Sequence, residues 1–165
     1  MRKWDLHAAG TISEFRKKYS FLSNYSEKCF IWKDRMFCNS EAAFQSEKSL
    51  DLTVRDSFTR LTPKEAKAAG RRVKLRPDWE EVKDGLMEEI VYEKFSQNDG
   101  LAIKLLETGD ATLIEGNNWH DQYWGVDLET GEGENKLGII LMRVRDRIRE
   151  DAEAYAEAYA EAQVS

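Results

Sequence analysis

The apolar residues between Asp78 and Ser96 recur at the spacing of a helix. Val82, Leu86 and Ile90 are each four residues apart, and residues four apart lie on the same helical face. The same stripe is widened by Met87, Val91, Lys94 and Phe95. We therefore predict one long helix here, with this stripe packed on a core.

A second stripe of this kind lies near the C-terminus. It predicts a helix packed on the body of the protein and consists of Leu137, Ile140, Leu141, Val144 and Ile148. From Asp151 the chain repeats Ala-Glu-Ala-Tyr, so its apolar content is mostly alanine. We expect this segment to remain helical but to pack little. We accordingly divide the chain into a domain of residues 1–150 and a helical tail of residues 151–165.

Capping residues predict the ends of three shorter helices. Ser40 can accept a hydrogen bond from the first turn of a helix that begins at Glu41. In Thr62-Pro63-Lys64-Glu65, proline stands at the first helical position and the glutamate can reach back to the cap. We expect that helix to end near Gly70. Residues 101–107 predict a further short helix, ended by Gly109.

The predicted strands are short. Residues 28–33 and 36–37 predict two strands about a turn at Asp34-Arg35, and residues 111–115 predict a third. Residues 116–134 are rich in Gly, Asn, Asp and Trp without any period, which predicts a loop. Because the strands are short and separated by helices, we predict an α+β fold, mainly α. We expect a single compact domain with a few short strands and a long C-terminal helix.

The composition is that of a folded globular chain. A length of 165 residues, with 41% hydrophobic and 34% charged residues, is enough for one core. The formal net charge of -6 provides no basic surface for wrapping duplex nucleic acid. The sequence has no apolar run long enough for a signal peptide or a membrane span. We therefore expect a cytoplasmic protein that does not bind a membrane.

Cysteine and histidine offer little for metal or thiol chemistry. Cys29 and Cys38 have no metal-ligand spacing to each other or to either histidine, and neither has the adjacent histidine of a nucleophilic thiol. Gly131-Glu-Gly133 lacks the further glycine of a dinucleotide-binding loop. We expect no metal and no cofactor, and we interpret both cysteines as reduced packing residues.

One row of polar residues is not explained by a core. Glu41, Gln45 and Lys48 are four and then three residues apart on the predicted helix, so they point from one face. An ordinary solvated face has the same spacing. The alternative is a cleft wall, in which the carboxylate acts on a water, Gln45 holds the water or the carboxylate, and Lys48 binds an anionic group. Spacing alone does not decide between the two interpretations.

The loop of residues 116–135 favours a cleft. It contains Trp119 and the run Tyr123-Trp124-Gly125-Val126-Asp127, and loops with large aromatic residues and glycines often form ligand surfaces. Trp124 can equally be a core residue. Trp79, at the start of the long helix, can either pack in the core or stack on a base.

Several blocks of residues, in a fixed order, carry a resemblance to a known family. They are Phe21–Tyr25, Ser40–Lys48, Gly70-Arg71, Leu75–Trp79, Met87, Lys94-Phe95, Leu105–Gly109, Glu115, Tyr123–Asp127, Gly133–Gly138 and Leu141–Arg145. With these blocks in register from about Thr11 to Ile148, the chain resembles the NADAR family of YbiA-like N-glycosidases. The tail has no counterpart in that family. Ala42-Ala43-Phe44 also departs from the pattern, because members often have His or Tyr beside the glutamate.

The resemblance implies an enzyme that hydrolyses an N-glycosidic bond. Family members are associated with cleaving the bond between base and ribose phosphate in early riboflavin-pathway intermediates. Others are associated with removing ADP-ribose from modified nucleobases in DNA. The implied partner is a small-molecule ribose-phosphate or ADP-ribose substrate, or an ADP-ribosylated nucleobase in DNA. The released base and the oligomeric state stay open.

The resemblance also implies roles for individual residues. Carried over to this chain, it makes Glu41 the catalytic glutamate and Asp127 a second active-site acid. It makes Trp79 and Trp124 the active-site aromatics. The polar positions that it places around the ribose and phosphate are Asn24, Lys48, Arg71 and Asn135.

These residue types suit the chemistry. Breaking the C1′–N bond builds oxocarbenium character on the ribose, which a carboxylate can stabilise while water attacks C1′. We expect Glu41 to be the base or charge stabiliser, and Asp127 to orient sugar hydroxyls or share the water. The two tryptophans would sandwich the base, and the cationic side chains of Lys48 and Arg71 would bind phosphate oxygens.

Two other classes of function remain open at this stage. A module that binds ADP-ribose or a related nucleotide without cleaving it would use the same pocket, but would have no turnover to lose when Glu41 is changed. A structural protein that pairs with partner helices through its tail would not be stabilised by nucleotides, because a ligand raises stability only when it binds the folded state.

Overall fold

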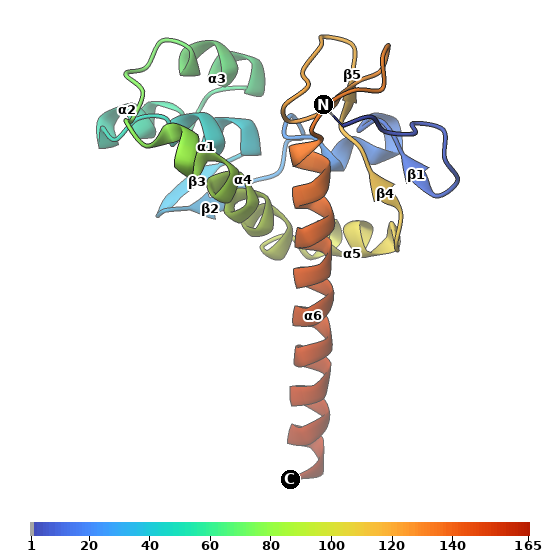
Figure 1. Ribbon diagram of the computed structural model, residues 1–165. Coiled ribbons are helices and arrows are strands. Elements are labelled where there is room, and N and C mark those ends of the chain that lie inside the picture. Colours follow the sequence, from blue (N-terminus) through green and yellow to red (C-terminus); the bar gives the residue numbers. More distant parts are fainter. Residues whose placement is uncertain (1) are drawn as a thin grey trace.

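Helices make up most of the regular structure in the computed structural model, which describes residues 2–165 (Figure 1). The α-helices are α1 (Ser40–Ser46), α2 (Leu52–Ser57), α3 (Pro63–Gly70), α4 (Trp79–Ser96), α5 (Asp99–Glu107) and α6 (Lys136–Val164). A 3₁₀ helix, η1, covers Lys17–Leu22. The predicted α+β fold, mainly α and with a long C-terminal helix, is confirmed.

Three pairs of short strands complete the fold. β1 (Thr11–Ile12) pairs in parallel with β4 (Thr112–Leu113), and β5 (Gly116–Asn117) pairs in parallel with β6 (Val126–Asp127). The antiparallel pair is β2 (Phe30–Trp32) with β3 (Arg35–Phe37). The predicted loop of residues 116–134 thus contains two short strands. Their pairing joins residues about ten positions apart in an irregular segment, which no local pattern reveals.

α4 and α6 form the centre of the core. The stripe predicted on α4 is buried at Met87, Ile90, Val91 and Phe95. It packs on the stripe of α6, where the buried apolar residues are Leu137, Ile140, Leu141, Val144 and Ile148. Both predicted amphipathic helices are therefore confirmed. Other elements, including α5, β2 and β4, pack against one or both of them.

The first turn of α1 differs from its prediction by one residue. Asn39, not Ser40, is the N-cap, and its Oδ1 accepts a hydrogen bond of 2.7 Å from the backbone N–H of Ala42. Ser40 is already helical, and its hydroxyl donates to Oδ1 of Asn24 over 2.9 Å. Ser40 is therefore turned toward a neighbouring loop, and the next acceptor along the chain caps the helix.

The capping box of α3 is confirmed. The hydroxyl of Thr62 accepts from the backbone N–H of Glu65, and the Glu65 carboxylate accepts from the backbone N–H of Thr62. Pro63 occupies the first turn, and α3 ends at Gly70 as predicted. This helix can be placed from sequence because its stabilising contacts are all local.

The hairpin β2–β3 corrects two predictions. The turn was predicted at Asp34-Arg35, but Arg35 already pairs with Trp32, so the two turn residues are Lys33 and Asp34. Both have positive φ, as the tight turn of a two-residue hairpin requires. Cys29 and Cys38, interpreted above as reduced packing residues, form a disulfide, and Cys29 is exposed. The register explains the disulfide. Phe30 pairs with Phe37, so the two cysteines occupy the next facing positions of the hairpin.

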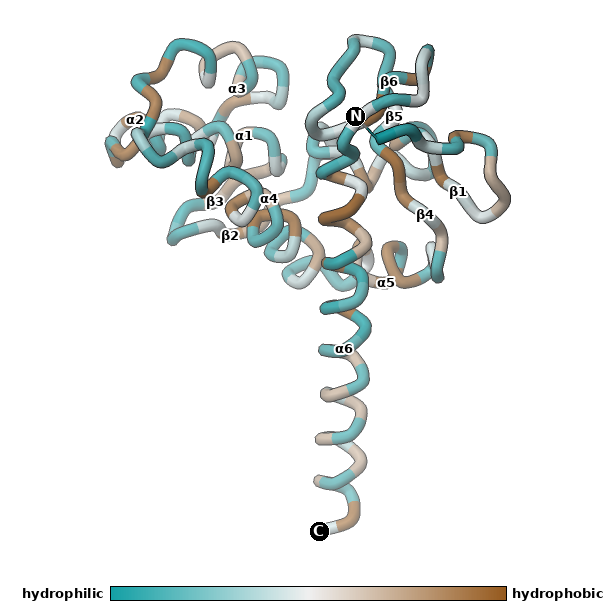
Figure 2. Tube along the Cα trace, in the orientation of Figure 1, coloured by the Kyte–Doolittle hydropathy of each residue, from teal (hydrophilic) through white to brown (hydrophobic). Residues whose placement is uncertain are grey.

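The C-terminal half of α6 projects from the body (Figure 1). Its buried residues end at Ile148, and residues 151–165 are all exposed, including Tyr155 at 74%. Figure 2 shows the hydrophobic residues of α6 gathered where it passes through the body, with alternating paler and polar residues beyond. Alanine side chains are too small to hold this segment against the body, so its helicity depends on intrinsic propensity. No helix within residues 2–165 combines the length and apolar character that a membrane crossing requires.

Candidate active site

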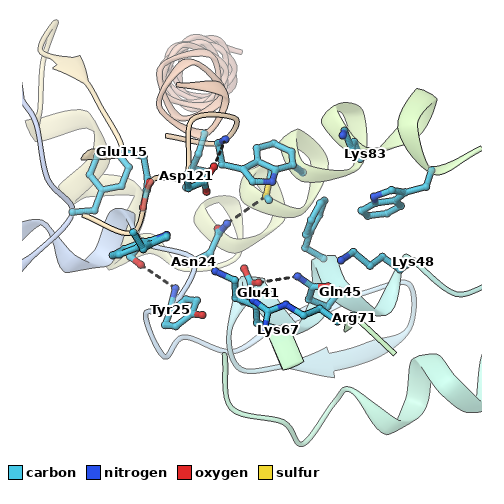
Figure 3. Close-up of a pocket in the computed structure, with 18 of the residues that line it drawn as sticks. Asn24, Tyr25, Glu41, Gln45, Lys48, Lys67, Arg71, Lys83, Glu115 and Asp121 are labelled. Atoms are coloured by element: carbon cyan, nitrogen blue, oxygen red, sulfur yellow. Dashed lines mark hydrogen bonds between the residues drawn. The ribbon is translucent and has the colours of Figure 1, made fainter. Parts of the chain in front are cut away.

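A cavity of about 580 Å³ opens among α1, α3, α4 and two loop regions, residues 15–25 and 115–124 (Figure 3). Its volume lies in the range of small-molecule sites. Charged, amide and aromatic side chains line it together. Most of the residues expected at a site converge here from segments that are far apart in the sequence.

α1 forms one wall of this cavity. Glu41 and Gln45 line it from the helix, and Glu41 is only 8% exposed. Lys48, which was predicted on the same helix, also lines the cavity but lies two residues beyond the end of α1. The side-chain Nε2 of Gln45 donates a hydrogen bond of 2.9 Å to Oε1 of Glu41 (Figure 3). The interpretation of this row as a solvated helix face is therefore wrong. The row is a cleft wall, with the amide holding the carboxylate.

The environment of Glu41 is mixed. Burial raises the pKa of Glu41, whereas the hydrogen bond from Gln45 and the positive charges of Lys67 and Lys48 act in the opposite direction. The negative charge of Asp121, across the cavity, adds to the increase. Glu41 is thus a buried carboxyl group whose ionised form has a hydrogen-bond donor and two cations nearby.

Basic side chains gather around the cavity although the chain as a whole is acidic. They are Arg16, Lys48, Lys67, Arg71 and Lys83. Burial lowers the pKa of Lys48, the nearby Glu41 carboxylate raises it, and Arg71, Lys67 and Lys83 lower it further. Four cations close enough to influence one another indicate a site for an anionic group, because a bound anion would relieve their mutual repulsion.

The aromatic residues form one continuous wall. Phe44 contacts Trp79 with ring centroids 5.0 Å apart, and it contacts Trp124 at 5.3 Å. Trp79 and Trp124 both line the cavity, as expected. Phe44 packs against both rings and joins the two indoles, and the sandwich of a base between them stays a prediction. The wall offers apolar ring surface to a flat ligand.

Asn24 reaches the cavity from a loop that a buried lysine holds in place. Its side chain accepts from the Ser40 hydroxyl and lies 3.5 Å from the sulfur of Met87. Nζ of Lys94, completely buried, donates to the carbonyl oxygens of Phe21 and Ser23 over 2.8 and 3.0 Å, and to the Ser26 hydroxyl over 2.8 Å. Burial lowers the pKa of Lys94 to about 7. Lys94 therefore fixes the loop that carries Asn24 and Tyr25.

Asp127 and Asn135 lie outside the cavity lining, unlike the other predicted site residues. One oxygen of Asp127 lies 2.7 Å from Nδ1 of His120, and the other accepts from the backbone N–H of Glu129. The geometry thus does not support Asp127 as an acid beside the sugar. One imidazole nitrogen of His120 and one carboxylate oxygen each of Asp127 and Glu129 lie within 4.8 Å of one another, a spacing that a metal ion could bridge.

Asn135 holds the chain next to the cavity. Its Oδ1 accepts from the backbone N–H of Glu115, and its Nδ2 donates to the carbonyl of Leu113, both over 2.9 Å. Asn135 is completely buried, with positive φ. It positions Glu115, and direct contact with a ribose phosphate, as expected above, does not fit this geometry.

Two acids that we did not predict as site residues line the cavity, Glu115 and Asp121 (Figure 3). Burial raises the pKa of Glu115 to about 8, and the negative charge of Asp121 adds to this. Asp121 accepts hydrogen bonds from the backbone N–H groups of Tyr123 and Trp124. Glu115 is one of the residue blocks of the resemblance. Asp121 lies in the aromatic loop between Trp119 and Trp124, and this position is the feature of the sequence that could have indicated it as a site residue.

Comparison with known proteins places the chain in a family. Residues 5–149 match the model of the NADAR domain. The chain belongs to the NADAR family. The matched segment covers the whole cavity and ends just before the projecting part of α6.

Named relatives of this NADAR chain are enzymes. N-glycosidase YbiA of Escherichia coli strain K12 is 36% identical over 133 residues, which cover 79% of this chain and 82% of YbiA. The NMR structure of E. coli YbiA matches with a TM-score of 0.76 at 30% identity, covering 86% of this chain and 85% of that one. The predicted resemblance and the N-glycosidase class of enzyme are confirmed.

A second group of relatives consists of longer proteins. Riboflavin biosynthesis protein VVA0006 of Vibrio vulnificus is 33% identical over 142 residues, which cover 81% of this chain but 37% of that protein. A chloroplastic riboflavin biosynthesis protein, PYRR of Zea mays, is 39% identical over 160 residues, 24% of its length. A NADAR domain thus occurs both as most of a chain and as one part of a longer chain.

Proposed function

We propose that this NADAR chain hydrolyses the N-glycosidic bond between a nucleobase-like heterocycle and ribose phosphate, as in the early intermediates of riboflavin synthesis. The observation that carries the proposal is the Glu41 carboxyl group. It is buried in the cavity wall, held by Gln45, and accompanied by the cations of Lys48 and Lys67. The relatives named for riboflavin biosynthesis support this substrate class.

Glu41 acts at the sugar in this proposal. As C1′–N cleavage proceeds, positive charge develops on the ribose, and an ionised carboxylate close by stabilises it. The same carboxylate can accept a proton from the water that attacks C1′. The hydrogen bond from Gln45 fixes the carboxylate so that it does not have to reorganise during the reaction.

The remaining side chains bind the two ends of the substrate. Lys48 and Arg71 lie on the same side of the cavity as Glu41 and supply donors for phosphate oxygens, which the planar guanidinium of Arg71 can bind in pairs (Figure 3). The heterocycle lies along the aromatic wall of Phe44, Trp79 and Trp124. An indole ring gives a flat base a stacking surface without demanding a particular base.

A ligand that carries ADP-ribose is the second candidate substrate. The several cations around the cavity favour a substrate with more than one phosphate, since Lys83 and Lys67 add to Lys48 and Arg71. An ADP-ribosylated base would place its diphosphate among these side chains. The acidic net charge of -6 disfavours an extended duplex footprint.

The test is turnover by Glu41→Gln. The purified chain is incubated with ribose-phosphate aminopyrimidines, NAD and ADP-ribosylated guanine, and released base is measured by mass spectrometry. Because general-base help contributes roughly 10²-fold or more, the variant should lose at least that factor while melting like the wild type. Glu107→Gln, an exposed carboxylate at the end of α5, is the matched control and should keep full activity.

The same experiment separates an enzyme from a binding module. Ligand-dependent stabilisation of the fold without release of any base by the wild-type chain would support a NADAR module that binds nucleotides without cleaving them. At a ligand concentration of 100 times the dissociation constant, binding alone should stabilise the fold by about 2.7 kcal/mol.

A further inference from the structure

The cavity holds two glutamates whose neighbours differ in charge. Glu41 accepts from an amide and lies near the cations of Lys67 and Lys48. Glu115 also accepts from an amide, that of Asn117, and lies near Lys67. The neighbour that acts on it most strongly, however, is the negative charge of Asp121, with Glu41 adding to it. Figure 3 shows Glu115 and Asp121 on the opposite side of the cavity from Glu41 and Gln45. Burial raises the pKa of both carboxyl groups, but the strongest neighbour of Glu41 favours its charged form, whereas the strongest neighbour of Glu115 favours its protonated form.

The backbone of Glu115 is held on both sides. Its N–H donates to Asn135 over 2.9 Å, and its carbonyl accepts from the N–H of Val126 over 2.9 Å. Gly125 lies directly against it, so that a Cβ at this position would overlap both the carbonyl and the carboxyl group of Glu115. The carboxyl group also accepts from Nδ2 of Asn117. Glu115 thus has the restricted geometry that a residue acting on a bound substrate needs.

The charge state follows from these surroundings. Burial, followed by the repulsion from Asp121, raises the pKa of Glu115 to about 8, so that its carboxyl group carries a proton at neutral pH. Asp121 has its own donors, the backbone N–H groups of Tyr123 and Trp124. These hydrogen bonds hold the Asp121 carboxylate in place at the cavity, where its negative charge acts on Glu115.

We propose that Glu115 is the general acid that protonates the departing heterocycle. This role rests on the proposed function and deepens it, because an amine or ring nitrogen leaves a sugar poorly unless it gains a proton. The two carboxyl groups then have separate roles on opposite sides of the cavity. Glu41 accepts a proton from the water and stabilises the charge on the ribose, and Glu115 donates a proton to the leaving group.

The hydrolytic step balances with these two groups and one water. The water oxygen forms a bond to C1′ as the C1′–N bond breaks, and the electron pair of that bond goes to the nitrogen. The nitrogen takes the proton of Glu115, and the carboxylate of Glu41 takes a proton from the water. Glu115 then regains a proton and Glu41 loses one to solvent, so that one water is consumed.

Two substrates with different leaving groups test the role. The first is a ribose 5-phosphate joined through nitrogen to an aminopyrimidine, which needs a proton to leave. The second is 4-nitrophenyl riboside 5-phosphate, whose phenolate leaves without one. Glu115→Gln should lose about 10²-fold in kcat/KM on the first substrate and less than about 10-fold on the second. Glu41→Gln should lose activity on both, and Glu107→Gln on neither.

The pH profile provides an independent readout. The wild-type activity on the aminopyrimidine substrate should fall above about pH 8, where Glu115 loses its proton. Glu115→Gln should lack this alkaline decrease. Glu115→Asp keeps an acid at this position and should recover part of the lost rate, which a purely structural defect would not allow.

The outcomes separate the two proposals. Unchanged activity of Glu115→Gln on the aminopyrimidine substrate would overturn the role of Glu115 and leave the N-glycosidase proposal standing. An equal loss on both substrates, in a variant at least as stable as the wild type, would do the same. If the wild-type chain cleaves neither substrate, the proposed function is overturned, and the role of Glu115 with it.

Discussion

Three buried or partly buried glutamates of this chain show how neighbours decide what a side chain does. Glu47, 1% exposed, accepts from the indole of Trp32 and is paired with Lys33, Arg55 and Arg76. Its hydrogen-bonding capacity is used within the fold, so it is a structural residue. Glu41 and Glu115 each accept from one side-chain amide and face the cavity, and Glu115 does so beside the negative charge of Asp121. Residue type alone would not distinguish them.

The raised pKa of Glu115 predicts a pH dependence of stability. An unfolded glutamate titrates near 4.5, whereas folded Glu115 titrates near 8, so the folded state binds more protons between these values. Stability from this residue is complete below pH 4.5 and is lost as pH rises to 8. Glu115→Gln should therefore gain stability over the wild type across this window, with an upper limit of about 5 kcal/mol.

Urea unfolding of both proteins at pH 5, 6, 7 and 8 measures this effect. The difference in the free energy of unfolding should increase steadily with pH. A constant difference would mean that Glu115 titrates alike in both states, and its assignment as a protonated acid would then lose its basis.

At the scale of elements, α1 matters most because the cavity wall depends on it. The helix is only seven residues long and every one of them is buried. It contacts α3 and α4, and Gly70 at the end of α3 leaves room for the side-chain amide of Gln45. The position of Glu41 is therefore set by packing between helices, with the local cap at Asn39 fixing where α1 begins.

Gly70→Ala tests this packing. A Cβ at Gly70 would overlap the amide of Gln45, which then has to leave its position and release Glu41. We expect turnover to fall about 10-fold or more, as misplacement of a catalytic group commonly does. Stability should change little, because the displacement of the Gln45 side chain is offset by the helix propensity of alanine, which exceeds that of glycine by up to about 1 kcal/mol.

The control for this variant is Gly85→Ala in α4. Gly85 is exposed and a Cβ there meets nothing within 4 Å, so the change should leave turnover unaltered and stabilise the fold slightly. Thermal melting and steady-state kinetics of both variants provide the comparison. Equal turnover in the two variants would show that Gln45 does not depend on Gly70.

At the scale of the whole molecule, the distribution of charge is uneven. The chain carries a net charge of -6, yet five basic side chains gather at one cavity. Positive potential in a concave site attracts anionic ligands and raises their local concentration. Acidic residues elsewhere, including Glu153, Glu157 and Glu161 on the projecting helix, account for part of the excess negative charge.

The projecting part of α6 is separate from the forces that hold the body together. Removing residues 152–165 deletes exposed residues alone, so the melting temperature and turnover should remain unchanged while the helical circular dichroism signal falls. Ending the chain at Asp146 is the contrasting variant. It also removes buried Ile148 and the guanidinium of Arg147, which lies 3.6 Å from the ring centroid of Tyr92. That variant should lose several degrees in melting temperature. A large loss in the shorter truncation would reveal a role for the tail in folding.

The sequence by itself determined the main helices and gathered Glu41, Gln45 and Lys48 on one side of a predicted helix, but it left open whether that side was a cavity wall or a solvated face. The period of α4 and α6, the capping box of α3 and the row of Glu41, Gln45 and Lys48 all depend on residues within a few positions of each other. Such patterns can be seen in the chain because helical contacts are local. The blocks that resemble the NADAR family added the class of enzyme.

Only the tertiary structure decided which acids share the cavity. Parallel pairing of β5 with β6 turns Asp127 toward His120, while Asn135 and Val126 fix Glu115 at the cavity. The hairpin register likewise joined Cys29 to Cys38, and packing placed Phe44 against both Trp79 and Trp124. These outcomes depend on contacts between distant segments. Local spacing does not fix which way the side chains of a strand point, because a shift of one residue in the pairing register turns every side chain to the other face.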